Sequence, residues 1–324
     1  MTENCFLGFD TSNYTTSVAL VDGEDRVICN LKQPLSVGAG EHGLRQSDAV
    51  FQHVKNLPLL AERLAPYLAG RTPLAVGVSE RPRDRDGSYM PCFLAGIAAA
   101  SHAAAVSALP LFRFSHQSGH LFAAIVSSRR FDLADRPFYA WHVSGGTTEL
   151  LAVTPTENGF DSEIVGGTRD LNAGQVIDRI GVALGVPFPA GPGLEKLALS
   201  YTGKIPKRKP VVRDGYVNLS GLENLALDLF KKTNDPAGVA AFVFSHIADA
   251  ILLMTDQTAE RYGARELLCA GGVMSSVILR RAIEERYPSA SFAEPALSSD
   301  NAVGIAALTA RAYRRNGEGG KTDP

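Results

Sequence analysis

The sequence predicts an α/β protein built from two related units. The 324-residue chain is long enough for two domains of ordinary size. Its first segment, CFLGFDTSNYTTSVALV, contains two β-runs joined by a turn of small polar residues, and FYAWHVSGGTTELLAV at 138–153 repeats this pattern. Two copies of one hairpin in a chain of this length indicate a duplicated α/β domain.

The segments between and after the hairpins alternate between helical and strand patterns. Residues 46–68 and 94–108 are amphipathic helical stretches, and PLAVGVSE at 73–80 is a short strand. Residues 267–285, LLCAGGVMSSVILRRAIEE, pass from an apolar strand through a glycine turn into a helix that ends near Arg286. Asp300 precedes the last helix of the chain.

Composition and charge limit the classes of function. Hydrophobic residues make up 45% and charged residues 20% of the chain, as in ordinary globular proteins. The net charge of −2 argues against a binder that relies on overall basicity, but it allows a local basic patch. The four cysteines form no C-x-x-C pair and residues 1–10 carry no secretory signal, so we expect a cytoplasmic protein without a zinc ribbon.

Residues 92–112, CFLAGIAAASHAAAVSALPLF, are long enough to cross a membrane. The stretch is rich in alanine and serine, carries His102 and ends at Pro110. We therefore expect a packed, buried helix and no membrane association. Residues 317–324 are predicted to be a disordered polar tail.

The hairpin turns offer chemistry for phosphate binding. Serine, threonine and glycine place hydroxyl and backbone N–H groups in a concave array, and glycine allows close approach of a ligand. One such turn alone is more simply a tight turn, but two copies and a glycine turn that leads into a helix favour a nucleotide site. The candidate residues are Thr11, Ser12, Val143, Ser144, Gly145, Gly146, Thr147, Gly271 and Gly272.

His116 and His120 are candidate metal ligands. In FSHQSGHLFAA they lie four residues apart, on one face of a predicted helix, and neutral imidazoles bind zinc or iron. Two structural histidines are the alternative. Gln117 stands where zinc peptidases of the H-E-x-x-H type need glutamate, which excludes that mechanism. Asp300 fits either a helix N-cap or a third ligand, and spacing does not decide between them.

Two charged segments have simple alternatives to function. ERPRDRD at 80–86 is predicted to be a solvated charged loop. KIPKRKPVVR at 204–213 is a basic loop interrupted by prolines, which fits either an inserted solvated loop or contact with a phosphate backbone.

Seven motifs, in order along nearly the whole chain, resemble the TsaD-type family of ligases that install threonylcarbamoyl on tRNA adenosine. They are GFDTS, HQSGH, VSGGTT, AGQVIDR followed by FPAGP, VNLSGL, GGVMSSVILR and SSDNA. The resemblance implies the two-lobed actin-like/sugar-kinase fold (ASKHA, duplicated ribonuclease H-like). It implies an N-terminal lobe of residues 1–112 plus 298–316 and a C-terminal lobe of residues 113–297.

The resemblance also implies a site and a reaction. The metal ligands would be His116, His120 and Asp300, holding one Fe or Zn ion. An adenine nucleotide (ATP or an AMP-adenylate) would be bound by the 143–147 turn with Asp178, Gly191 and Ser276. Asp10 would support catalysis. The activity would be transfer of threonylcarbamoyl from its adenylate to N6 of a tRNA adenosine, with tRNA and a TsaB-like protein, bound through the N-terminal lobe, as partners.

Several positions depart from the family pattern. Tyr14 and Thr15 stand where acidic residues are usual, Thr147 replaces a histidine, Ser276 replaces an asparagine, and the charged 80–88 segment replaces a glycine-rich loop. These changes predict a diverged paralogue. The alternatives are a carbamoyltransferase with a small-molecule acceptor, a non-catalytic nucleotide-binding partner of the true ligase, and a sugar-kinase-type phosphotransferase, for which no catalytic aspartate is evident.

Overall fold

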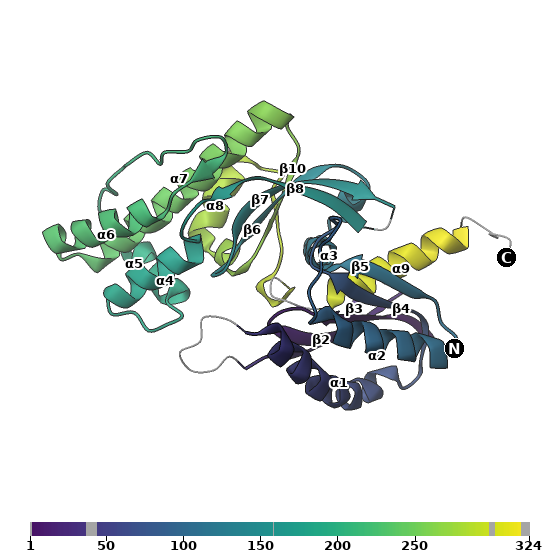
Figure 1. Ribbon diagram of the computed structural model, residues 1–324. Coiled ribbons are helices and arrows are strands. Elements are labelled where there is room, and N and C mark those ends of the chain that lie inside the picture. The colour runs from purple at the N-terminus through teal and green to yellow at the C-terminus, as the bar shows by residue number, and fades with distance from the viewer. Residues whose placement is uncertain (1, 37–43, 158, 298–301, 319–324) are drawn as a thin grey trace. The chain divides into compact units, whose positions relative to one another are not determined.

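The computed structural model describes residues 2–36, 44–157, 159–297 and 302–318. The chain divides into two compact units (Figure 1). The first comprises Met1–Asp135, Pro155–Asp161 and Leu297–Pro324, and the second comprises Arg136–Thr154 and Ser162–Ala296. The first unit thus continues to Asp135, beyond the boundary expected at residue 112, because the helix that carries both histidines packs within it.

The first unit is built on a five-stranded sheet with the order β3-β2-β1-β4-β5. Strands β1, β2 and β3 are antiparallel neighbours, and β4 and β5 add in parallel. The predicted N-terminal hairpin is therefore confirmed as β1 and β2. The bounds are β1 Glu3–Thr11, β2 Thr15–Asp22, β3 Val27–Pro34, β4 Arg71–Arg81 and β5 Leu111–Ser115.

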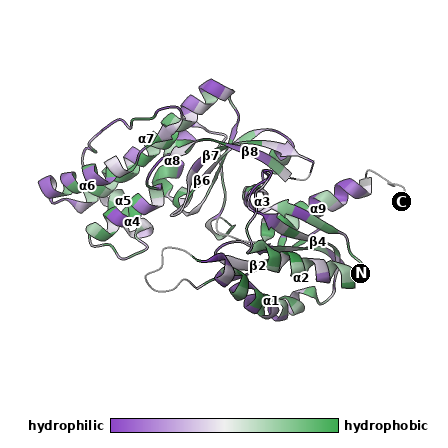
Figure 2. Cartoon of the chain, in the orientation of Figure 1, coloured by the Kyte–Doolittle hydropathy of each residue, from purple (hydrophilic) through white to green (hydrophobic). Residues whose placement is uncertain are grey.

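Helices cover both faces of this sheet, and their bounds are α1 Gln46–Leu68, α2 Phe93–Val106, α3 His116–Ser128 and α9 Val303–Glu318, with a 3-10 turn η1 at Phe131–Ala134. Helices α1 and α2 pack against β1–β4, and α9 packs against β1, β2, β4 and α3. Figure 2 shows α9 changing from hydrophobic to hydrophilic towards its C-terminal end. The apolar stretch expected to be a buried helix is α2, but only one face of it is buried, and Leu94 and Val106 lie exposed on the other.

Strand β1 is buried on both faces because its side chains alternate between the two helical layers. Cys5, Leu7 and Phe9 belong to the core that contains residues of α1 and α2. Phe6 packs on Tyr313 of α9, and the Cα of Gly8 lies directly under the α9 backbone. Successive residues of β1 therefore face the two helical layers in turn, and this alternation continues to Asp10 and Thr11.

Helices α3 and α9 cross almost backbone to backbone. A Cβ atom built on Gly304 would lie 1.8 Å from the Gly119 carbonyl oxygen, and one built on Gly119 would lie 2.9 Å from Ile305 Cδ1. Both contacts are closer than packed carbon atoms allow. Glycine at these two positions therefore brings α3, with its histidines, onto the sheet.

The second unit repeats the plan with a six-stranded sheet of order β11-β10-β6-β7-β8-β9. Strands β6 and β7 form the predicted second hairpin, and β10 pairs with β6 in parallel, as β4 does with β1. Trp141 on β6 is fully buried in its core. The bounds are β6 Phe138–Val143, β7 Thr148–Thr156, β8 Gly159–Thr168, β9 Tyr216–Val217, β10 Glu266–Ala270 and β11 Ser291–Phe292.

The helices of the second unit are α4 Ala173–Ala183, α5 Gly191–Ser200, α6 Ser220–Thr233, α7 Pro236–Tyr262 and α8 Val277–Arg286, with 3-10 turns η2 at Gly272–Ser275 and η3 at Pro295–Leu297. Within the described residues, α7 alone is long and apolar enough to cross a membrane. Its most apolar window is 72% buried, as in a core helix, and it packs against α5, α6 and α8.

Gly304 offers a test of the α3–α9 crossing. We expect Gly304→Ala to lower the free energy of unfolding by about 3 kcal/mol, because the added methyl group meets backbone atoms that cannot move independently. Urea unfolding followed by far-UV circular dichroism measures it. Gly317→Ala is the matched control on the same helix: a methyl group added there would meet nothing within 4 Å, so helix propensity should raise stability by up to about 1 kcal/mol. Equal stability of Gly304→Ala and the unmodified chain would contradict the close crossing.

Candidate functional site

A buried carboxylate and the two predicted histidines form a connected row in the first unit. Asp10, at the end of β1, lies on the face of Phe6 and Gly8, towards α3 and α9. Its Oδ1 atom is 2.9 Å from His116 Nδ1 and accepts a hydrogen bond from Ser79 Oγ at 2.5 Å. His116 Nε2 is in turn 3.0 Å from His120 Nε2. The prediction that both histidines share one helical face is confirmed.

The carboxylate of Asp10 determines which nitrogen of His116 carries the proton. Asp10 is fully buried, and an ionised carboxylate accepts hydrogen bonds only, so His116 Nδ1 donates to it. A ring with its single proton on Nδ1 presents an unprotonated Nε2 towards His120. A carboxylate behind a histidine is the arrangement that orients metal-binding imidazoles in proteins.

The residues present fit a divalent cation of the zinc or iron type. Two nitrogens 3.0 Å apart are close to the separation required when both bind one cation at about 2.1 Å. Asp10 Oδ2 is buried and has no hydrogen-bond partner among the described residues, so the carboxylate keeps acceptor capacity. No further His, Cys, Asp or Glu completes a three-ligand group in the described part of the chain. The predicted third ligand, Asp300, lies outside the described residues.

The segment predicted to be a solvated loop instead holds the start of α3. Asp84 Oδ2 accepts hydrogen bonds from Ser115 Oγ at 2.6 Å and Ser118 Oγ at 2.7 Å, and Arg81 pairs with Asp84 Oδ1 at 2.7 Å. Ser115 also caps the helix by accepting from the Ser118 N–H. The prediction was wrong at Asp84 because its partners, Ser115 and Ser118, come from a strand and a helix that sequence spacing did not connect to it.

The first turn is buried rather than open to a ligand. Thr11 is fully buried, and its hydroxyl accepts from the Gly96 N–H at 3.1 Å, which joins β1 to α2. Ser12 is 3% exposed, and its carbonyl oxygen is 2.9 Å from His53 Nε2. Contacts within the unit therefore hold both residues, and their contact with a nucleotide stays a prediction.

His53 supports this turn and was missed in the sequence. Its Nδ1 atom is 2.8 Å from Thr16 Oγ1, and its ring is fully buried. Burial lowers the pKa of His53, although the Ser12 carbonyl and the Asp10 carboxylate oppose the shift. The residue lies on the buried face of α1 with Ala49 and Leu60, a periodicity that could have identified it.

In the second unit, predicted residues from separate segments meet at one pocket of about 380 Å³. Those that line it are Gly145, Asp178, Gly191, Gly272 and Ser276. Open space surrounds Gly145 and Gly272, where an added Cβ would meet nothing within 4 Å. Three apolar side chains, Ile177, Phe244 and Val273, complete much of the wall.

The predicted turn at 143–147 is held by its own serine. Ser144 Oγ accepts from the backbone N–H groups of Gly146 at 3.2 Å and Thr147 at 3.1 Å. These two N–H groups are therefore occupied, whereas the sequence predicted that they would be free for phosphate. Val143 is fully buried, and its carbonyl oxygen would be 2.2 Å from a Cβ on Gly271, whose φ is +101°. Gly271 thus serves the close packing of β6 on the following turn.

Hydrogen bonds define the polar edge of the pocket. Asp178 Oδ1 accepts from the Ala190 N–H at 2.7 Å. Ser276 caps α8 by accepting from the Leu279 N–H, and its hydroxyl donates to Glu195 Oε1 at 2.5 Å. The helix expected directly after Gly271-Gly272 begins only at Val277, after the η2 turn. Glu195 was missed, although it follows Gly191 by one helical turn on α5.

Comparison with solved structures identifies the fold class. The T. kodakarensis HypF structure matches with a TM-score of 0.60 over 97% of this chain and 48% of its own, at 12% identity. The activator of 2-hydroxyisocaproyl-CoA dehydratase from Clostridium difficile matches with a TM-score of 0.53 over 99% of both chains, at 12% identity. A ROK family glucokinase from Streptomyces griseus matches at 0.50 over 95% of this chain and 99% of its own, at 13% identity. The chain has the α/β fold of actin-like proteins and sugar kinases.

Within that class, sequence comparison identifies the family. The profile described as "tRNA N6-adenosine threonylcarbamoyltransferase" matches residues 50–307. The protein of that name from Thermus thermophilus is 32% identical over 95% of this chain and 93% of its own length. The one from Bacillus licheniformis is 28% identical over 98% and 94%. The chain belongs to the tRNA N6-adenosine threonylcarbamoyltransferase family.

The buried His53 predicts a pH-dependent stability. Its pKa in the folded chain lies below the ordinary value of 6.5, so the unfolded chain binds its proton first as the pH falls. The free energy of unfolding should therefore decrease as the pH falls below about 6.5, with a contribution of at most about 1.4 kcal/mol per pH unit. Urea unfolding at pH 5 to 7 should show a shallower dependence in His53→Gln. Identical slopes for both proteins would contradict this role of His53.

Proposed function

We propose that the protein transfers a threonylcarbamoyl group from threonylcarbamoyl-adenylate to N6 of an adenosine in tRNA, and that it is a diverged member of its family. The observation that carries this proposal is the meeting of Gly145, Asp178, Gly191, Gly272 and Ser276 at one pocket. Family membership supplies the reaction class, and the pocket supplies chemistry suited to the adenylate.

The pocket in the second unit would bind the adenylate. Its apolar wall of Ile177, Phe244 and Val273 suits the faces of an adenine ring. Asp178 uses Oδ1 for the Ala190 N–H, and its carboxylate has further lone pairs for a ribose hydroxyl. The open backbone at Gly145 and Gly272 allows a phosphate to approach closely.

The histidine row in the first unit would hold one divalent cation, either Fe or Zn. His116 and His120 would be ligands through their Nε2 atoms, and Asp10 would fix the orientation and tautomer of His116. A cation bound there supplies Lewis-acid chemistry for the polarisation of a donor oxygen. Ser79 in turn fixes the Asp10 carboxylate by donating to Oδ1.

The reaction balances without a covalent enzyme intermediate. The N6 amine attacks the carbamoyl carbon, the new N–C bond forms, and the bond from that carbon to the phosphate oxygen breaks to release AMP. The amine loses one proton in this step, and the departing AMP phosphate or water accepts it. The protein's contribution is positioning of the two reactants and stabilisation of the developing charge.

Serine stands at position 276 where the family usually has asparagine, and the contacts of Ser276 suggest why this change would weaken adenylate binding. The Ser276 hydroxyl already donates to Glu195 and accepts from the Leu279 N–H. It therefore stabilises α8 and has little capacity left for a ligand. This local change supports a diverged activity rather than loss of the pocket, because Asp178 and the glycines remain.

A transfer assay tests the proposal. With threonylcarbamoyl-adenylate and an unmodified tRNA transcript, we expect threonylcarbamoyladenosine in the digested tRNA, detected by mass spectrometry. Asp178→Asn keeps an acceptor for the Ala190 N–H but removes the charge, so KM for the adenylate should rise about tenfold. Glu163→Gln, on an exposed part of β8, is the matched control. Absence of product with the unmodified chain would contradict transfer by this chain on its own, and an unchanged KM in Asp178→Asn would exclude this pocket.

Metal analysis tests the histidine row. The purified protein should contain about one Fe or Zn per chain, and His120→Ala should lose it, because one imidazole supplies much of the site's geometry. Asp10→Asn should weaken the metal affinity about 10- to 100-fold through loss of the oriented His116. Elemental analysis and metal titration measure both effects. His102→Ala is the control, since His102 lies exposed on α2. A His120→Ala protein with full metal content would refute the assignment.

A further inference from the structure

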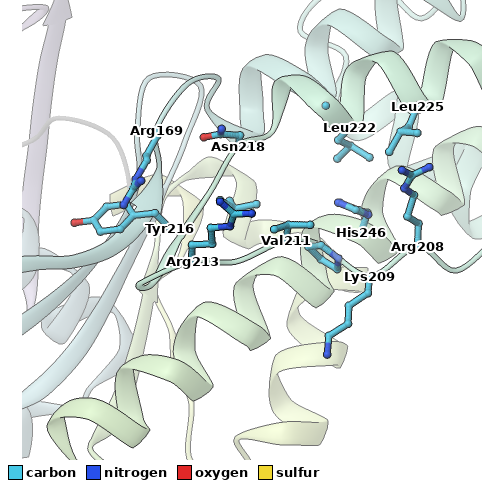
Figure 3. Close-up of a pocket in the computed structure, with 13 residues that line it drawn as sticks. Arg169, Arg208, Lys209, Val211, Arg213, Tyr216, Asn218, Leu222, Leu225 and His246 are labelled. Carbon is cyan, nitrogen blue, oxygen red and sulfur yellow. The ribbon is translucent and has the colours of Figure 1, made fainter.

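A second cavity of about 460 Å³ lies in the second unit, apart from the residues that line the proposed adenylate pocket. It is formed by the basic 208–213 segment, β9, the start of α6 and His246 on α7. The volume falls within the range of about 300–1,000 Å³ that small-molecule sites occupy. Figure 3 shows Arg208 and Arg213 on either side of His246, with Lys209 extending away from them.

The lining of this cavity is strongly cationic. Among the described residues it includes Arg169, Arg208, Lys209 and Arg213 and contains no aspartate or glutamate. None of these four cations forms an ion pair with any residue that the structure describes. The neighbouring Asp170 carboxylate is already used, since it accepts from the Leu219 N–H and the Ser220 N–H and hydroxyl. The cavity lining therefore carries four cations without an ion pair among the described residues, and Asp249 is the carboxylate that acts on His246.

Arg169 is positioned by an aromatic ring rather than by an acid. Its guanidinium lies 4.9 Å from the centre of the Tyr216 ring. Stacking of this kind holds an arginine in place and leaves its N–H donors available. One arginine guanidinium can donate two parallel N–H hydrogen bonds to two oxygens of the same phosphate. Three arginines around one cavity therefore favour a phosphate-bearing ligand.

His246 adds a second, independent indication of a ligand. Its ring is 8% exposed, lines the cavity, and its Nδ1 atom has no hydrogen-bond partner within the described residues. Burial lowers the pKa of His246, so the ring is neutral near pH 7. A buried polar nitrogen without a partner is costly, and ligand binding can remove that cost. A hydroxyl group can both donate and accept, so it satisfies Nδ1 in either tautomer.

We propose that this cavity binds one nucleotide unit of an RNA chain. Arg208 and Arg213 bind its phosphate, and His246 Nδ1 bonds the ribose 2′-hydroxyl, the group that distinguishes RNA from DNA. The inference rests on the proposed function in taking this RNA to be the acceptor tRNA. A phosphate suits the two arginines, and a neighbouring hydroxyl suits His246 Nδ1. A ribonucleotide unit carries both groups side by side.

The charge part is tested by the salt dependence of tRNA binding. Fluorescence anisotropy of a labelled, unmodified tRNA gives Kd at several salt concentrations. The double variant Arg208→Ala/Arg213→Ala should bind at least about tenfold more weakly. Its slope of log K against log salt should be smaller by about 1.5 to 2, one phosphate contact for each arginine. Arg281→Ala, an exposed arginine of α8 in the same unit, is the control. Equal Kd and slope in the double variant would overturn the proposal.

The hydroxyl part is tested by His246→Phe, which removes the ring nitrogens and can pack against Phe242, whose ring centre is 5.8 Å from that of His246. We expect tRNA to bind about three- to tenfold more weakly. Binding of a DNA of the same sequence should be unchanged, because it offers no 2′-hydroxyl. If this variant has a lowered melting temperature, His246→Gln replaces it. Equal losses for RNA and DNA would overturn the role of His246.

The outcome is separable from that of the transfer assay. Arginine-dependent tRNA binding without threonylcarbamoyl transfer supports the cavity and rejects the proposed function. Normal transfer with tRNA binding unaffected by the arginines rejects the cavity alone. Free AMP at micromolar concentration that displaces tRNA from the unmodified chain and not from the double variant identifies a mononucleotide site, which also overturns the RNA assignment.

Discussion

The alternation of side chains along β1 is the constraint on which the first unit depends. Because β1 lies between two helical layers, odd-numbered residues such as Phe9 enter one core, and even-numbered residues such as Gly8 face α9. Asp10 continues the even series and meets His116, while Thr11 continues the odd series and bonds the Gly96 N–H of α2. A shift of one residue would exchange the two and place a carboxylate against α2.

The contact between Asp10 and His116 also requires that α3 keeps its position. Two separate sets of contacts hold α3 in place. Close packing brings α3 to α9, with Gly304 against the α3 backbone and Gly119 against the Ile305 side chain. Asp84 then binds Ser115 and Ser118 at the N-terminal end of α3, so the helix begins at the residue that contacts Asp10. The histidine row is therefore held by backbone contact on one side and by a charged cap on the other.

The sequence was a good guide to patterns that repeat locally and a poor guide to partners from distant segments. Both hairpins and the shared helical face of His116 and His120 follow from short-range periodicity, and the motifs grouped Asp178 with Ser276, which line one pocket. The periodicity of α1 could have shown that His53 is buried, but its bond to Thr16 could not be predicted. The bonds of Asp84 and Glu195 could not be predicted either, because each partner lies more than 30 residues away in the chain. The N–H groups of Gly146 and Thr147, expected to be offered to phosphate, are bonded by Ser144 Oγ. A hydroxyl next to a glycine pair can satisfy the N–H groups of its own turn.

The net charge of −2 hides two sites of opposite character in the second unit. The pocket with Asp178 and Glu195 is apolar with carboxylates at its edge, which suits the base and ribose of a nucleotide. The cavity with Arg208 and Arg213 is lined, among the described residues, by cations and no carboxylate, which suits a phosphate backbone. Under the two proposals above, the first pocket would take the base and ribose of the adenylate donor, and the second cavity would take the phosphates of the acceptor RNA. The two sites of this unit would then distinguish donor from acceptor by charge before any base is recognised.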